Sequence, residues 1–197
     1  MLITESISKD EKHLENSILE KEIEKFLNEF DLNADFLIDI FPNKVDDYLK
    51  YNQIEIFFQK FLNRDISKKA FIDEEEKFIR FFIYLWSLNN TFAFVNNITP
   101  LNKNYVAKKC KKEIKKYKNS EEKNHSLFKV KNVDILKSLI HIGAREISQV
   151  YLFFIEWNII IELSGLVALI QFENQKNIIE IGNIANVCNL FARDRER

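Results

Sequence analysis

The amino-acid sequence predicts an α+β protein that is mainly helical, and three observations support this prediction. Only 3 glycines and 2 prolines interrupt its 197 residues, so long helices meet few breaks. Apolar residues recur at helical spacing through most of the first 118 residues. Closer to the C-terminus, β-branched and aromatic residues form short runs that favour strands. We therefore expect an N-terminal bundle of about four helices, followed by a helix, a small antiparallel β-hairpin or meander and a C-terminal helix.

The four helices of the predicted bundle follow from apolar stripes and from residues that favour helix ends. They cover about residues 8–30, 45–62, 73–97 and 103–118. Ser8 and Glu11 have the spacing of a capping box, which indicates where the first helix begins. Pro100 cannot continue the third helix, so that helix should end near Asn96 and Asn97.

The C-terminal region combines helices with strands. We expect helices over about 133–147 and 175–187, strands over 150–155, 159–161 and 166–170, and a last short strand within 188–192. Ser164 and Gly165 suit the turn between two of these strands. The whole chain, 1–197, is predicted as one domain with a helical region over 1–118, a loop over 119–131, an α/β region over 132–192 and a frayed tail over 193–197.

The run 147–172 is apolar and long enough to cross a bilayer, but its acidic residues argue against a membrane span. Glu156 and Glu162 would lie in hydrocarbon, where each costs roughly 2.5–3.5 kcal/mol. The first residues mix charges and lack the apolar run of a signal peptide, and Cys110 and Cys188 are far apart. We therefore expect reduced thiols, no membrane association and a cytoplasmic location. The many Lys, Ile, Asn and Phe residues indicate AT-rich coding of a bacterial type.

Charge is unevenly distributed although the formal net charge is only -1. Residues 1–100 carry 12 basic and 19 acidic side chains, whereas residues 101–132 carry 11 basic and 3 acidic ones. An acidic helical half is thus followed by one strongly basic segment. Each invites a hypothesis about a binding partner.

Acidic and aromatic residues form the first candidate site, a surface for a protein partner. Its members are Asp73, Glu74, Glu75, Glu76, Glu156, Trp157 and Glu162. The run 73–76 could attract a basic partner, while residues near strand ends could anchor it. The simpler alternative is that the acidic run stabilises the first turn of a helix.

Lysines of the predicted helix 103–118 form the second candidate site, for nucleic-acid phosphates. They are Lys108, Lys109, Lys111, Lys112, Lys115 and Lys116. Clustered lysines bind phosphates without reading sequence. The segment has no arginine for contacts with base edges, so a solvated helix face is the competing interpretation.

Motifs for catalysis, cofactors and metals are not found in the sequence. The three glycines are isolated, so no phosphate-binding loop exists. His13, His125 and His141 lack thiol or acidic neighbours at metal-ligand spacing. We expect no cofactor and no metal, and an enzymatic site assembled from distant residues stays an open alternative.

We therefore expect a non-enzymatic, cytosolic protein-binding module, such as an immunity or inhibitor protein that binds and masks a toxin or nuclease. Its partner would be another protein, for instance a basic toxin domain. The alternative is a nucleic-acid-associated accessory protein that uses the lysine-rich helix 103–118. The sequence leaves the oligomeric state open.

Overall fold

The computed structural model describes residues 3–9, 21, 23, 25–27, 30, 34, 36–42, 65–95, 112, 115, 127–173 and 175–194. Within them, seven strands form one antiparallel sheet in the order β3-β2-β4-β5-β6-β1-β7. The strands are β1 (Phe36–Asp39), β2 (Thr91–Val95), β3 (Leu127–Lys129), β4 (Val150–Phe154), β5 (Ile159–Ser164), β6 (Val167–Phe172) and β7 (Phe191–Asp194). The helices are α1 (Ile3–Lys9), α5 (Asp65–Ser87), α8 (Val133–Ala144) and α9 (Ile178–Val187), and the 3-10 turn η4 (Gln175–Asn177) leads into α9.

Strands β4, β5 and β6 form a continuous meander at the centre of the sheet. Val150 lies opposite Leu163, and Ile161 lies opposite Ile170. The β5–β6 turn begins with Gly165, whose φ of 62° lies in the left-handed region that glycine adopts without steric cost. These three strands were predicted from the sequence, but they belong to a much larger sheet.

Side chains of the central strands alternate between two apolar cores because successive residues of a strand point to opposite faces. On β4, Leu152 and Phe154 enter the first core, whereas Tyr151 and Phe153 enter the second. Both faces of this region of the sheet are therefore buried. This explains why the strands read as continuous apolar runs rather than as alternating ones.

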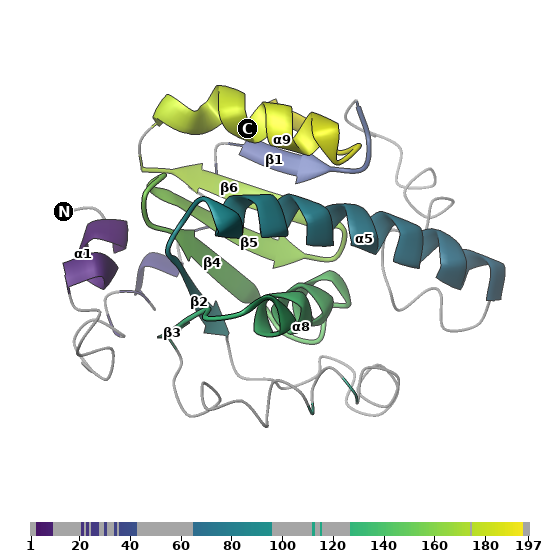
Figure 1. Ribbon diagram of the computed structural model, residues 1–197, viewed down its shortest axis with the longest axis horizontal. Helices are drawn as coiled ribbons and strands as arrows, with labels where there is room; N and C mark the ends of the chain where they lie inside the picture. The colour runs from purple at the N-terminus through teal and green to yellow at the C-terminus, as the bar shows by residue number, and fades with distance from the viewer. Residues whose placement is uncertain are drawn as a thin grey trace.

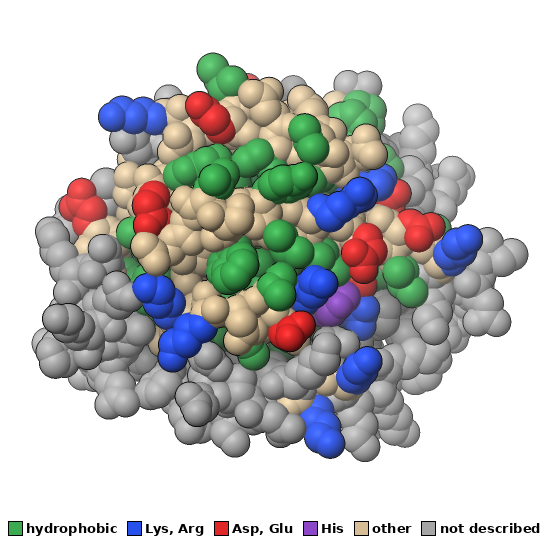
Figure 2. All heavy atoms as spheres, viewed as in Figure 1, with side chains coloured by type: hydrophobic (Ala, Val, Ile, Leu, Met, Phe, Trp, Pro, Cys, Tyr) green, Lys and Arg blue, Asp and Glu red, His purple; other side chains and the backbone are tan. Residues whose placement is uncertain are grey.

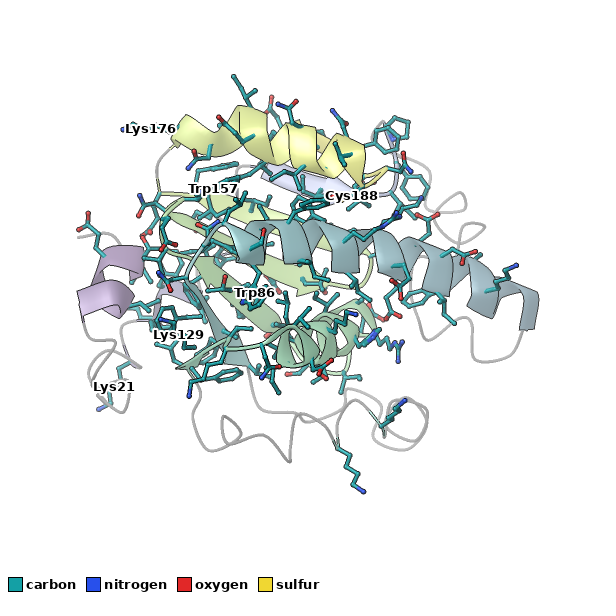
Figure 3. All side chains as sticks on the ribbon, in the orientation of Figure 1. Lys21, Trp86, Lys129, Trp157, Lys176 and Cys188 are labelled. Carbon is teal, nitrogen blue, oxygen red and sulfur yellow. The ribbon has the colours of Figure 1, made fainter. Side chains whose placement is uncertain are left out.

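Three helices cover the first face of the sheet. Figure 1 shows α9, α5 and α8 lying side by side across it. The long helix α5 lies in the middle and buries Phe78, Phe82 and Leu85. Trp86, near the end of α5, donates its indole N–H to the carbonyl oxygen of Val130 at 3.0 Å, so that the end of the helix is tied to the residue after β3 (Figure 3).

The second face is covered by α1 and by helical residues between positions 21 and 30. Ile7, Leu27 and Phe30 pack there against the aromatic side chains of β2 and β4. The carboxylate of Glu173, just after β6, accepts the backbone N–H of Thr4 at 3.1 Å and two further hydrogen bonds from the start of α1. The first turn of α1 is thereby held to the end of the sheet.

The predicted fold class was wrong. The structure has a seven-stranded antiparallel sheet, not a mainly helical protein with a four-helix bundle and a small hairpin. Strands β1 and β3 were missed because each is short and pairs with residues far away along the chain. Phe36, for example, lies opposite Ile170 and Asp194. Such pairing produces no local pattern.

The other wrong predictions concern where individual helices and strands begin and end. Helix α5 begins at Asp65 rather than near Asp73, and the residues expected to continue it to Asn97 include strand β2. Ser8 lies inside α1 and does not cap a helix. β3 lies within the predicted loop 119–131, and β7 includes two residues of the predicted tail. The predicted helix 45–62 lies outside the described residues.

The rejected membrane span, 147–172, is folded mainly as the three central strands. Among the described helices, none has both the length and the apolar composition that a membrane span requires. The strand prediction for this segment is thus confirmed, although its setting in the sheet was not foreseen.

Candidate functional site

The acidic run 73–76 lies in the middle of α5, and its four side chains do not form one surface. Asp73 and Glu76 are exposed, and Glu74 pairs with Lys77 at 2.6 Å. Glu75 points inward and is only 1% exposed. The run therefore does not stabilise a first helical turn, because the helix begins eight residues before Asp73.

Glu75 is the centre of a buried ionic cluster that joins α5 to α8. Arg145, the C-terminal cap of α8, donates two hydrogen bonds of 2.7 Å to its carboxylate. Nδ1 of His141 lies 3.0 Å from the same carboxylate, but the ring is not aligned for a well-formed hydrogen bond. A bidentate arginine–carboxylate pair fixes orientation as well as distance, so it sets how the two helices meet.

Burial raises the pKa of Glu75, but its contacts with His141 and Arg145 outweigh this effect and hold the pKa below the ordinary value of 4.5. The carboxylate is therefore ionised at neutral pH. The sequence contained one signal for this placement: Glu75 falls on the buried stripe of α5 with Phe71, Phe78 and Phe82. Its bidentate partner could not be identified, because Arg145 lies 70 residues away.

Glu156 and Trp157 lie in the β4–β5 turn and serve local structure. The carboxylate of Glu156 accepts hydrogen bonds from the backbone N–H and the side-chain amide of Asn90, each at 2.5 Å. Asn90 lies in the turn between α5 and β2, so these bonds connect the two turns. The backbone N–H of Trp157 donates to the side chain of Asn89 at 3.0 Å. The indole of Trp157 is partly buried against the first core, near the start of α9 (Figure 3).

Glu162 is buried within β5, on the second face of the sheet, opposite Tyr151 and Leu169. The structure thus separates the three groups of the predicted acidic and aromatic site. They occupy the middle of α5, a turn at one end of the sheet and the second sheet face.

A second ionic pair, Asp39 with Arg193, was not expected from the sequence. Asp39 on β1 is buried and accepts from the guanidinium of Arg193 on β7 and from the backbone N–H of Phe41. Burial raises the pKa of Asp39 above its ordinary value of 3.8, and these contacts oppose the rise only in part. No pattern links two positions 154 residues apart.

Two of the six lysines of the predicted nucleic-acid site are described. Lys112 and Lys115 are helical and exposed, and their spacing places them on one side of a helix. The other four, Lys108, Lys109, Lys111 and Lys116, lie outside the described residues. Of the basic side chains elsewhere, Lys129 lies over the ring of Phe92 at 5.8 Å (Figure 3).

In the portion of the chain that the structure describes, no group of three His, Cys, Asp or Glu side chains could hold a metal ion. Cys188 is buried at the end of α9, and this burial raises the pKa of its thiol above the ordinary value of 9.0 despite the nearby charge of Arg80. A protonated, buried thiol is a poor nucleophile. Cys110 lies outside the described residues.

The outer surface of α5 and α9 carries large apolar side chains that the sequence analysis did not single out. We call them the α5–α9 face: Tyr84 (47% exposed), Leu88 (54%), Ile179 (75%) and Val187 (68%). In Figure 2, apolar side chains gather over the middle and upper area of the molecule, where Figure 1 places these helices, and few charged side chains lie among them. Large exposed apolar patches mark interaction sites.

Comparisons with other proteins do not assign this surface. No protein-family model matches the chain, and no curated protein and no solved structure matches it.

Proposed function

We propose that this chain is a protein-binding module of the inhibitor or immunity type and that the α5–α9 face is its contact surface. The observation that carries the proposal is the exposure of four large apolar side chains on two adjacent helices. Covering each of them stabilises a complex by roughly 1–2 kcal/mol through removal of apolar area from water. A partner that covers all four side chains gains binding free energy that offsets part of the cost of association.

Charge at this face favours an apolar partner over a strongly charged one. Arg80 and Glu76 are exposed on α5, and Lys176 and Glu180 are exposed at the start of α9, so both signs occur. Such a surface provides little long-range attraction, and binding should depend weakly on salt. The proposed contact therefore differs from the acidic site that the sequence suggested.

A direct test uses the purified chain and a candidate toxin encoded by an adjacent gene. Titration calorimetry should show a complex, and Tyr84→Lys with Leu88→Lys should weaken it at least about tenfold, because two charges would be buried without partners. Ala70→Lys with Ser164→Lys adds the same charge at exposed positions outside the face and serves as the control. Absence of a complex, or equal loss in both variants, would contradict the proposal.

Nucleic-acid binding is a second candidate function, favoured by the exposure of Lys112 and Lys115 on one side of a helix. Binding of mixed-sequence RNA at low salt should then fall when all six candidate lysines are replaced by Gln. Unchanged RNA binding in that variant would remove this candidate.

A further inference from the structure

We propose that α1 is a releasable strap, which Glu173 latches over the second core of the sheet and which uncovers that core when it opens. Figure 1 shows α1 beside the sheet, away from the layer of α5, α8 and α9. The structure itself shows what covers this side of the second core, because Ile7 of α1 is packed into it. The inference goes beyond the proposed function and concerns the other face of the sheet.

The latch is the carboxylate of Glu173, which lies directly after β6. It accepts three hydrogen bonds from the first turn of α1: from the backbone N–H of Ile3, from the backbone N–H of Thr4 at 3.1 Å and from the hydroxyl of Thr4. The first N–H groups of a helix have no partner within the helix, and a negative charge near them is favourable. Hydrogen bonds to an ionised acceptor are also stronger than neutral ones. One carboxylate therefore holds the start of α1 to the sheet.

The latch residue is fixed by the sheet and not by α1. The backbone N–H of Glu173 donates to the carbonyl oxygen of Asn158 at 2.9 Å, and Asn158 belongs to the β4–β5 turn. Ile159, the next residue, lies opposite Phe172 in the β5–β6 pair. The side-chain Oδ1 of Asn158 also lies 2.9 Å from Oγ1 of Thr4. Glu173 therefore keeps its position at the end of the sheet whether α1 is docked or open.

The remaining attachment of α1 is small and largely polar. Among the side chains of α1 that the structure describes, Thr4, Ser6 and Ile7 are buried, and Ile7 is the apolar one of these three. Ile3 is only partly buried against the second core. Strand β4, in contrast, buries all five of its residues. Segments with few buried apolar side chains open at a lower free energy than the core, so α1 should open while the sheet stays folded.

Opening of α1 changes what the second core presents to water. Ile7 is fully buried in this core, which also contains Phe30, Tyr151 and Phe153. Departure of Ile7 bares the apolar position that it occupies. Exposed apolar surface of this kind marks sites of interaction, so the strap controls access to it without any change in the sheet.

Amide hydrogen exchange of the purified full chain, in urea concentrations below the unfolding transition, tests the strap. Exchange of the protected amides of α1 (Ile3–Lys9) should depend little on urea, because local opening exposes little surface. Exchange in β4 (Val150–Phe154) should depend steeply on urea, because it requires unfolding of the sheet. Equally steep dependence in both segments, or an α1 without any protection, would overturn the proposal.

Glu173→Gln tests the latch by the same measurement. It should speed exchange of the α1 amides at least about tenfold, because a neutral acceptor replaces the ionised one. Glu156→Gln is the matched control: it makes the same chemical change at the same end of the sheet, but Glu156 accepts its hydrogen bonds from Asn90. Its α1 amides should exchange as in the natural chain. Unchanged α1 exchange in Glu173→Gln, or an equal rise in Glu156→Gln, would overturn the role of Glu173.

Discussion

Helices α8 and α9 lie on the same face of the sheet, yet they differ in how completely the chain covers them. Eight of the twelve residues of α8 are buried, whereas only Ile181 and Ala185 are buried among the ten of α9. Gly143 of α8 lies so close to β5 that an added Cβ would be 2.9 Å from the carbonyl oxygen of Leu163, while the space beside Gly182 is open. Helix α8 is therefore covered by its own chain, whereas α9 leaves the apolar side chains of Ile179 and Val187 exposed.

The largest expected effect concerns the cluster that locks α8 to α5. Arg145→Met leaves the buried carboxylate of Glu75 without its bidentate partner and should lower the free energy of unfolding by about 3 kcal/mol. Urea denaturation measures this loss. The double variant Glu75→Met, Arg145→Met should lose less than the single one, because no buried charge remains. A larger loss in the double variant would contradict this account of the cluster.

A smaller effect, of opposite sign at the two positions, is expected when a methyl group is added to each of the two helix glycines. Gly143→Ala should destabilise the protein by about 1–3 kcal/mol, since α8 or β5 must shift to admit the new atom. Gly182→Ala is the matched control and should stabilise the chain by about 0.5–1 kcal/mol. Changes of the same sign in both variants would remove the contrast between the helices.

The dependence of stability on pH should be the smallest effect, because two buried carboxylates act in opposite directions. The pKa of Glu75 is lowered, so its contribution to stability is present above about 4.5 and is lost as the pH falls through its folded value. The pKa of Asp39 is raised, so its contribution is present below about 3.8 and is lost as the pH rises through its folded value.

Unfolding free energies between about pH 2 and 7 can separate these two contributions. Glu75→Gln should reduce the gain in stability with rising pH, and Asp39→Asn should increase it. A Glu75→Gln curve parallel to that of the natural chain would show that this carboxylate does not have the lowered pKa.

What the sequence could predict depends on how local each signal is. Helix α8 and the meander of β4, β5 and β6 were found, because their apolar patterns and the turn at Gly165 lie within short stretches. The sheet as a whole was not found. β1 lies between β6 and β7, and β2 lies between β3 and β4. The strands paired in this way are far apart along the chain, or are too short to show a period in the sequence.

The candidate sites show the same limit. The acidic run 73–76 is visible in the sequence, but only the fold reveals that Glu75 is held by Arg145 and that its neighbours point elsewhere. The exposed Ile179 and Val187 could not be told from core residues, because an apolar stripe on a helix predicts burial whether or not its own chain supplies the cover.

Amide hydrogen exchange with and without the candidate toxin partner tests most directly whether α9 makes contact beyond its own chain. Protection of the amides in Ile178–Val187 should rise when the partner is added, while protection in Val133–Ala144 should not change, because α8 is already covered. Equal protection of α9 in both samples, or an equal rise in both helices, would contradict a specific contact through α9.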